Sequence, residues 1–140
     1  MVLLDTNVLS ELVRPEPDEK VVSWLDSLDA ATVATTAITA AELLYGVARL
    51  PDGRRKQQLS EAIDGLIEED FDGRIEPFDV TAATHYAALV SDRDTLARPI
   101  SVADAQIAAI ARKLEATLAT RNIEDFKDTG IDLIDPWEPR

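Results

Sequence analysis

The chain has 140 residues, of which 46% are hydrophobic and 29% charged, with no cysteine, one histidine and a net charge of −13. These values are typical of a single globular domain, and they exclude disulfides, thiol catalysis and metal sites built from cysteine or several histidines. The acidic balance argues against a broad DNA-coating surface, but it suits clustered acids that bind divalent cations and it suits a basic protein partner.

The N-terminal stretch Val2–Leu4 is typical of a buried strand in a parallel sheet, because three apolar residues follow one another near the chain end. Thr6 is predicted to cap the helix that follows. Asp5 lies between the two, where the strand ends. Ligands of open parallel sheets bind at the carboxyl ends of strands, so Asp5 is a candidate site residue. The alternative is that Asp5 only assists the turn and the helix start.

Predicted strands and helices alternate along the rest of the chain. Strands are expected over residues 31–35, 74–78, 117–120 and 131–134. Helices are expected to begin near residues 18, 39, 54, 79 and 101, and the one from residue 54 is expected to reach Phe71. The proline in 74–78 predicts an edge strand. This alternation predicts an α/β fold with one domain over residues 1–140, in which helices flank a central parallel sheet of four to five strands.

Two further features are assigned to the fold rather than to a site. His85 lies within an apolar helical pattern and is predicted to pack. The basic run Arg54–Lys56 is more typical of a solvated helix start than of an RNA-binding surface. Since no apolar stretch is long enough to cross a bilayer and the N-terminus lacks the pattern of a signal peptide, we expect a cytoplasmic protein with no membrane partner.

Several acids are placed at one edge of the predicted sheet, where helices begin and strands end. Asp5 ends the first strand. Glu42 and Asp104 are each placed in the first turn of a helix. Asn122 and Asp125 follow the fourth strand. All five therefore share an edge, and a crevice opens between the first and fourth strands if these are neighbours.

Glu42 and Asp104 also match a pattern that needs no ligand. Thr39-x-x-Glu42 and Ser101-x-x-Asp104 are both sequences of the kind that cap helices. Three acids on one edge, however, repel one another unless a cation lies between them. Together with Asp5, they therefore indicate a hard divalent metal with oxygen ligands, and Mg²⁺ or Mn²⁺ is favoured.

Four stretches resemble the PIN domain, and most of all the VapC-type ribonuclease toxins of bacterial toxin–antitoxin pairs. The stretches are Leu3–Leu12, Thr39–Gly46, Ile100–Ala109 and Leu118–Phe126. Each motif is weak when taken singly, but four in the family's order at this spacing are specific, and together they span essentially the whole chain.

The resemblance implies a Mg²⁺-dependent endoribonuclease toxin whose metal ligands and catalytic acids are Asp5, Glu42 and Asp104. It implies RNA as the substrate and a cognate antitoxin as the partner, within a homodimer or a toxin–antitoxin hetero-oligomer. The acidic composition suits a basic antitoxin. Many family members carry a fourth aspartate where this chain has Asn122, so the fourth acidic role is the point at which the chain departs from the family.

Asp125 lies three residues after Asn122 and is predicted to supply that charge as a further catalytic acid, through a metal-bound water. The alternative is that Asp125 only caps the turn before Phe126. The reaction implied is attack of an activated water on an RNA phosphodiester, which leaves a 5′-phosphate and a 3′-hydroxyl. The side chains expected to position water or phosphate oxygens are Thr6, Asn7, Thr120 and Asn122.

Two other classes of function use a similar framework. A phosphatase or receiver-like domain becomes phosphorylated on an aspartate at a strand end. The phosphatase pattern needs a second aspartate where this chain has Asn7, and a receiver domain needs a cluster of acids before the phosphorylated residue, whereas Asp5 is the first acid of this chain. A non-catalytic binding module with a decayed site is the other alternative, and the presence of all three acids speaks against it. No glycine-rich phosphate loop is present, which excludes the common kinases and ATPases.

Overall fold

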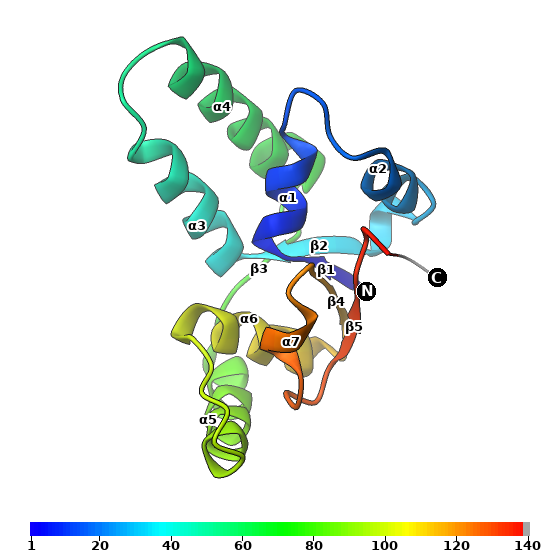
Figure 1. Cartoon of the computed structure of the whole chain (residues 1–140), viewed down its shortest axis with the longest axis vertical. Helices are drawn as coiled ribbons and strands as arrows, with labels where there is room; N and C mark the ends of the chain where they lie inside the picture. The colour runs from blue at the N-terminus through cyan, green and yellow to red at the C-terminus, as the bar shows by residue number, and fades with distance from the viewer. Residues whose placement is uncertain (139–140) are drawn as a thin grey trace.

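The computed structural model describes residues 1–138 and shows a five-stranded sheet with helices on both faces (Figure 1). The strands are β1 (Val2–Leu4), β2 (Val33–Thr36), β3 (Ile75–Glu76), β4 (Thr117–Ala119) and β5 (Asp132–Ile134). The helices are α1 (Thr6–Leu12), α2 (Glu19–Asp26), α3 (Ala37–Ala48), α4 (Arg54–Gly65), α5 (Val80–Thr95), α6 (Val102–Leu114) and α7 (Ile123–Phe126). The predicted α/β fold is thereby confirmed; residues 139–140 of the predicted domain lie outside the described residues.

All strand pairs are parallel, and their order across the sheet is β3-β2-β1-β4-β5. The central strand is β1, whose Leu3 pairs with Ala34 on one side and with Leu118 on the other. The chain builds outward from β1 through β2 to β3, then returns to add β4 on the opposite side. The boundary between β1 and β4 is therefore the topological switch point, where ligands of such sheets bind.

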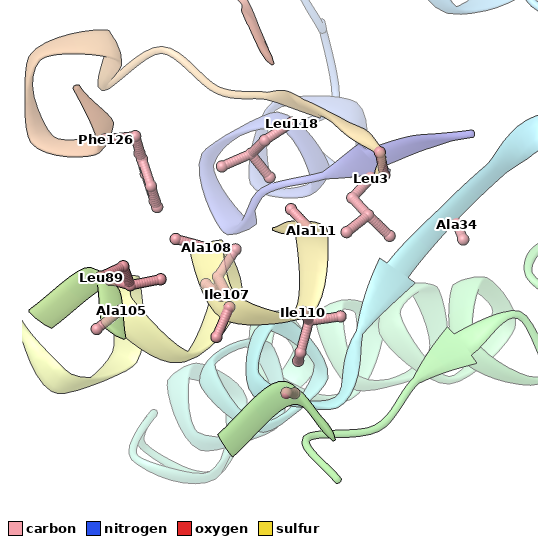
Figure 2. Packing of buried hydrophobic residues seen from close by; sticks show 13 residues of the cluster. Leu3, Ala34, Leu89, Ala105, Ile107, Ala108, Ile110, Ala111, Leu118 and Phe126 are labelled. Carbon is pink, nitrogen blue, oxygen red and sulfur yellow. The ribbon is translucent and has the colours of Figure 1, made fainter. Parts of the chain in front are cut away.

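The core consists of two layers, because successive residues of β1 point to opposite faces. Leu3 packs with Ile107, Ile110, Leu118 and Phe126 on the face covered by α5, α6 and α7 (Figure 2). Leu4 packs on the other face, against α1 to α4, with a cluster that contains Val8, Leu9, Trp24, Leu43 and Ile63. Burial on both faces explains why β1 is apolar throughout rather than alternating.

Some predicted elements start or end at other residues in the structure. The second strand is β2, which begins at Val33, because residues Ala30–Thr32 form a 3-10 turn capped by Asp29. The helix expected to reach Phe71 is regular only to Gly65 and ends in a π-helical turn over Leu66–Asp70. The edge position predicted for the third strand is confirmed by β3. Within residues 1–138 no helix has both the length and the apolar character needed to span a membrane.

Two helix starts differ from the prediction in a way that matters for the site. Thr6 does not cap α1; Asp5 does, and its Oδ1 accepts a hydrogen bond from the Thr6 N–H at 2.8 Å. Helix α3 begins earlier than expected, because Thr36 at the end of β2 caps it by accepting from the Thr39 N–H at 3.1 Å. Glu42 therefore lies in the second turn of α3, not the first, and the predicted Thr39-x-x-Glu42 capping box is not formed.

Candidate active site at the carboxyl edge of the sheet

Asp5 lies at the switch point between β1 and β4, and only 4% of its surface is exposed. Its Oδ1 caps α1. Its Oδ2 accepts hydrogen bonds from the Thr120 hydroxyl at 2.7 Å and from the Asn7 amide at 3.3 Å. Burial raises the pKa of the Asp5 carboxyl above its usual value, although the hydrogen bonds from Thr120 and Thr6 work in the opposite direction. Asp5 is thus a carboxylate held rigidly in a partly dry position.

Asn7 and Thr120, two of the predicted positioning residues, build the frame around Asp5. The Asn7 amide also donates to the Thr120 hydroxyl at 3.3 Å, and its Oδ1 accepts from the Arg121 N–H at 3.1 Å. The Thr120 hydroxyl accepts from the Asn122 N–H at 3.1 Å. These bonds tie the start of α1 to the segment after β4, so their first effect is to fix the geometry of the Asp5 carboxylate.

Glu42 reaches the same edge from α3. Its side chain is exposed, and its Oε1 accepts a hydrogen bond from the Thr6 hydroxyl at 2.7 Å. The repulsion from Glu42 is one of the causes that raise the pKa of Asp5, so the two carboxylates interact although they do not touch. Thr6 therefore links the two acids, because its N–H donates to Asp5 and its hydroxyl donates to Glu42.

Asp104 lies in the first turn of α6 and is half-buried. Its N–H donates to the hydroxyl of Ser101 at 3.2 Å, so the predicted cap at this helix is confirmed. The pKa of the Asp104 carboxyl is nevertheless raised, first by burial and then by repulsion from Asp5, Asp125 and Glu42. Asp104 therefore belongs to the same acidic cluster as Asp5.

Asn122 and Asp125 flank the start of α7, and both are exposed. Asn122 occupies the N-cap position but makes no side-chain capping bond. Asp125 is bound to it through the backbone, with its N–H donating to the Asn122 carbonyl at 3.1 Å. The Asp125 carboxylate is close enough to raise the pKa of Asp104. Asp125 thus lies within electrostatic range of Asp104, and Asn122 is the residue at the cap position.

Arg93, which was not predicted as a functional residue, holds the loops at this edge of the sheet. The side chain is 3% exposed, and it donates hydrogen bonds to four backbone carbonyls, those of Arg98, Pro99, Asp125 and Lys127. These carbonyls belong to the loop before α6 and to the end of α7. The available signal was spacing, because Arg93 lies four and seven residues after Leu89 and Tyr86 on the apolar stripe of α5.

A PIN domain model matches residues 2–131 of this chain. The chain belongs to the PIN domain family. Among related PIN domain proteins, it is 40% identical over 139 residues to VapC ribonuclease Y4jK from Sinorhizobium fredii, covering 99% of both chains. It is 45% identical over 137 residues to toxin FitB from Neisseria gonorrhoeae, covering 98% of this chain and 99% of FitB.

Solved PIN domain structures superpose closely on this one. A structure described as FitAB bound to an IR36 DNA fragment matches with a TM-score of 0.93 and 44% identity, over 100% of this chain and 98% of that chain. A toxin–antitoxin complex from Klebsiella pneumoniae matches with a TM-score of 0.72 and 25% identity, over 99% of each chain. The family resemblance seen in the motifs is confirmed, and these matches give no support to the phosphatase or receiver-like alternatives.

The side chains at the edge of this PIN domain fit a hard divalent cation by their chemistry. Within residues 1–138 none of the four carboxylates forms an ion pair with lysine or arginine, so their repulsion is not relieved by the protein. Asp5, Glu42 and Asp104 share the edge on which they were predicted, but no three acidic or histidine side chains of the described residues lie close enough together to ligate one ion by themselves. The physical reason is that hydroxyl and amide groups already engage Asp5 and Glu42. Carboxylates that lie near one another without meeting at one point suit an ion that keeps several of its waters, as Mg²⁺ does.

We expect Asp104→Asn to stabilise the metal-free PIN domain at neutral pH and to remove most of the stabilisation by Mg²⁺. The folded state raises the pKa of Asp104, so ionising this group costs stability. The cost is absent well below 3.8, the ordinary aspartate value, where the group is protonated in both states; it grows as the pH rises from that value to the folded pKa and is constant above it. The gain in Tm should therefore be present at neutral pH and disappear near pH 3.8.

The measurement is thermal unfolding of both proteins in EDTA and in Mg²⁺, at neutral pH and at acid pH. If Asp104 were a helix cap and nothing more, its replacement would lower the Tm and leave the response to Mg²⁺ intact, and losing a cap costs about 0.5–2 kcal/mol.

Proposed function

We propose that this PIN domain is a Mg²⁺-dependent endoribonuclease that acts in the cytoplasm as the toxin of a toxin–antitoxin pair. The observation that carries the proposal is the acidic cluster of Asp5, Glu42, Asp104 and Asp125 at the switch point of the sheet. Its members repel one another and have no cationic partner in the described residues. The name of the 40% identical relative, VapC ribonuclease, supports the reaction type.

The residues have distinct roles in this proposal. Asp5 and Asp104 would hold the ion with the aid of Glu42, partly through the waters that Mg²⁺ retains because the three carboxylates do not meet at one point. When bound, Mg²⁺ would supply positive charge for the phosphodiester and lower the pKa of a water. Thr120 and Asn7 keep the Asp5 carboxylate in one orientation. The N-terminus of α6 favours the anionic substrate. Hydrolysis breaks the bond between phosphorus and O3′ and leaves a 5′-phosphate and a 3′-hydroxyl.

The direct test is incubation of the purified protein with RNA in Mg²⁺, in EDTA, and in EDTA with Mg²⁺ restored in excess. The proposal expects cleavage in the first and third conditions and none in the second. Mn²⁺ is expected to replace Mg²⁺, because both prefer oxygen ligands. Equal cleavage in all three conditions would exclude the metal-dependent reaction.

Asp125→Asn is expected to raise the Mg²⁺ concentration needed for half-maximal cleavage, because the cluster loses a negative charge that acts at a distance. Asn122→Asp is expected to lower it, because this variant restores an acid at the position where many family members have one. A titration of cleavage rate against Mg²⁺ gives both values. If Asp125→Asn leaves the Mg²⁺ dependence unchanged, the site works with three acids and Asp125 serves the fold alone.

The proposed partner is a basic antitoxin that covers the acidic cluster. An unpartnered cytoplasmic ribonuclease damages its own cell, and an exposed carboxylate such as Glu42 offers an arginine a bidentate contact. The solved toxin–antitoxin complex of a related PIN domain supports this proposal. We expect protomers of the two proteins to bind 1:1, within a homodimer of the toxin or a larger hetero-oligomer.

Glu42→Gln is expected to weaken antitoxin binding by about tenfold, which corresponds to about 1.4 kcal/mol. Glu61→Gln, an exposed acid of α4 outside the cluster, serves as the matched control and should leave the affinity unchanged. Calorimetric titration of the antitoxin against each variant gives the affinities and the stoichiometry. Tight binding that leaves RNA cleavage unaffected would place the partner elsewhere on the surface.

A further inference from the structure

A groove of about 460 Å³ opens from the acidic cluster between α1, α3 and α4. Its lining includes Thr6 and Glu42, which already belong to the candidate active site. In Figure 1, α3 and α4 form a hairpin that extends away from the sheet, with α1 beside it. The groove is therefore continuous with the site and leads from the sheet edge along these three helices.

Each of the three segments contributes an arginine to this groove, namely Arg14 after α1, Arg49 at the end of α3 and Arg55 at the start of α4. We call it the arginine groove. Arg49 lies seven residues beyond Glu42 on α3, roughly 10 Å along the helix. The acids and the arginines thus lie at different ends, with an apolar floor between them that includes Val47 and Ile63.

The charges of Arg49 and Arg55 are not compensated by the described part of the chain. Both side chains are exposed, and neither forms an ion pair or a side-chain hydrogen bond within residues 1–138. Arg14, by contrast, pairs with Glu11 at 3.2 Å. In a chain of net charge −13, two uncompensated arginines along one groove form a local positive site.

The basic run Arg54–Lys56 is divided by the structure into three different environments. Arg55 lines the arginine groove, followed on the same face of α4 by Gln58 and Leu59. Lys56 turns away, donating to the Ala48 carbonyl at 3.2 Å and pairing with Asp52 at 3.5 Å. Arg54 is exposed and lies outside the lining of the groove. The expected solvated helix start is confirmed for Arg54 and Arg55, which are both exposed at the start of α4, and Arg55 also lines the arginine groove.

We propose that the arginine groove binds the RNA strand on one side of the cleaved phosphodiester, with Arg49 and Arg55 contacting backbone phosphates. This inference rests on the proposed ribonuclease function. The four carboxylates of the acidic cluster outnumber the charges of one divalent cation, so cations beside the cluster would add to the affinity for a polyanion. A guanidinium group binds two phosphate oxygens through two parallel hydrogen bonds. The apolar floor accepts the faces of bases or riboses, and Gln58 and Ser10 offer hydrogen bonds to them.

The separation of Arg49 from Glu42 along α3 fits contact with a neighbouring phosphate rather than with the reacting one, and Arg55 lines the same groove at the start of α4. Arg49 and Arg55 are positioning residues in this proposal. Their loss should raise KM and leave kcat at saturating RNA unchanged, because they contribute equally to binding the ground state and the transition state. An acidic peptide is the other occupant that the charges allow; continuity with the site of hydrolysis favours RNA.

The test compares Arg49→Gln, Arg55→Gln and the double variant with Arg54→Gln, a control that removes the same charge one residue away and outside the groove. Steady-state cleavage of a short single-stranded RNA gives kcat and KM. The double variant is expected to raise KM on the order of tenfold. Arg54→Gln is expected to leave both constants unchanged.

Binding of the same RNA, measured by fluorescence anisotropy in the inactive Asp5→Asn background, separates the two proposals. Each arginine removed from the groove should flatten the slope of log affinity against log salt concentration by about 0.7. If the wild-type protein fails to cleave RNA but these slopes change as expected, the proposed function fails and the groove assignment stands. If the groove variants bind RNA like Arg54→Gln, the assignment is overturned. It is also overturned if they lose antitoxin binding while RNA binding is unchanged.

Discussion

Replacing Asp5 with asparagine should reduce RNA cleavage by about 100-fold or more, because at metal sites even the loss of a residue that only hydrogen-bonds to a ligand costs about 10–100-fold. The substitution keeps the shape of the side chain. Its amide oxygen is still able to accept from the Thr6 N–H, so the cap of α1 is preserved. The variant loses the negative charge at the switch point, together with the Oδ2 acceptor for the Thr120 hydroxyl and the Asn7 amide. The rate of cleavage of a labelled RNA in Mg²⁺ measures the effect.

Asp92→Asn is the matched control for this experiment. Asp92 is an exposed acid of α5, a helix that covers the face of the sheet opposite α1. The Asp92→Asn variant should cleave RNA at the wild-type rate, and both variants should give the circular dichroism spectrum of the folded protein. Equal cleavage by Asp5→Asn and Asp92→Asn would remove Asp5 from the catalytic residues.

Arg93→Met is expected to give the largest loss of stability outside the apolar core. The buried guanidinium satisfies four backbone carbonyls, and methionine fills part of the volume without donating any hydrogen bond. Leaving a buried acceptor without a partner costs about 1–3 kcal/mol for each group, and these four bonds are only partly buried, so we expect a total loss of about 3 kcal/mol. Urea unfolding should show a lower midpoint with an unchanged m-value.

Arg98→Met is the matched control, because it removes a neighbouring arginine whose side chain is partly exposed rather than buried. Arg98 forms partly exposed ion pairs with Asp128 at 2.7 Å and Glu124 at 3.6 Å. Pairs of this kind contribute about 0–1 kcal/mol, so this control should be nearly neutral. If Arg93→Met costs no more than Arg98→Met, the loops before α6 and after α7 are held by packing rather than by Arg93.

Much of the fold followed from local patterns. The apolar run of Val2–Leu4 indicated a central strand buried on both faces, and the structure places it there with Asp5 at its carboxyl end. The Ser101 cap located the start of α6, and so located Asp104. These predictions succeeded because each depends on residues that are adjacent in the sequence.

The predictions that failed depend on contacts between distant segments or on a choice between similar residues. Thr36 and Thr39 are equally good caps by composition, and the length of β2 decides for Thr36, which moves Glu42 into the second turn. The bond from Thr6 to Glu42 and the bond from Thr120 to Asp5 join residues 36 and 115 positions apart. No local pattern indicates such pairs, and the engagement of both acids by hydroxyl groups explains why the three carboxylates do not meet at one point.

The most direct test of the central claim is to map the new ends formed when the protein is incubated with total cellular RNA. Wild-type protein and Asp5→Asn are each compared in Mg²⁺ and in EDTA, and ends carrying a 5′-phosphate are ligated and sequenced. We predict defined new 5′-phosphate ends in one of the four samples, the wild-type protein with Mg²⁺. New ends in EDTA or with Asp5→Asn, or ends that carry a 5′-hydroxyl, would contradict a metal-dependent hydrolysis at this acidic cluster.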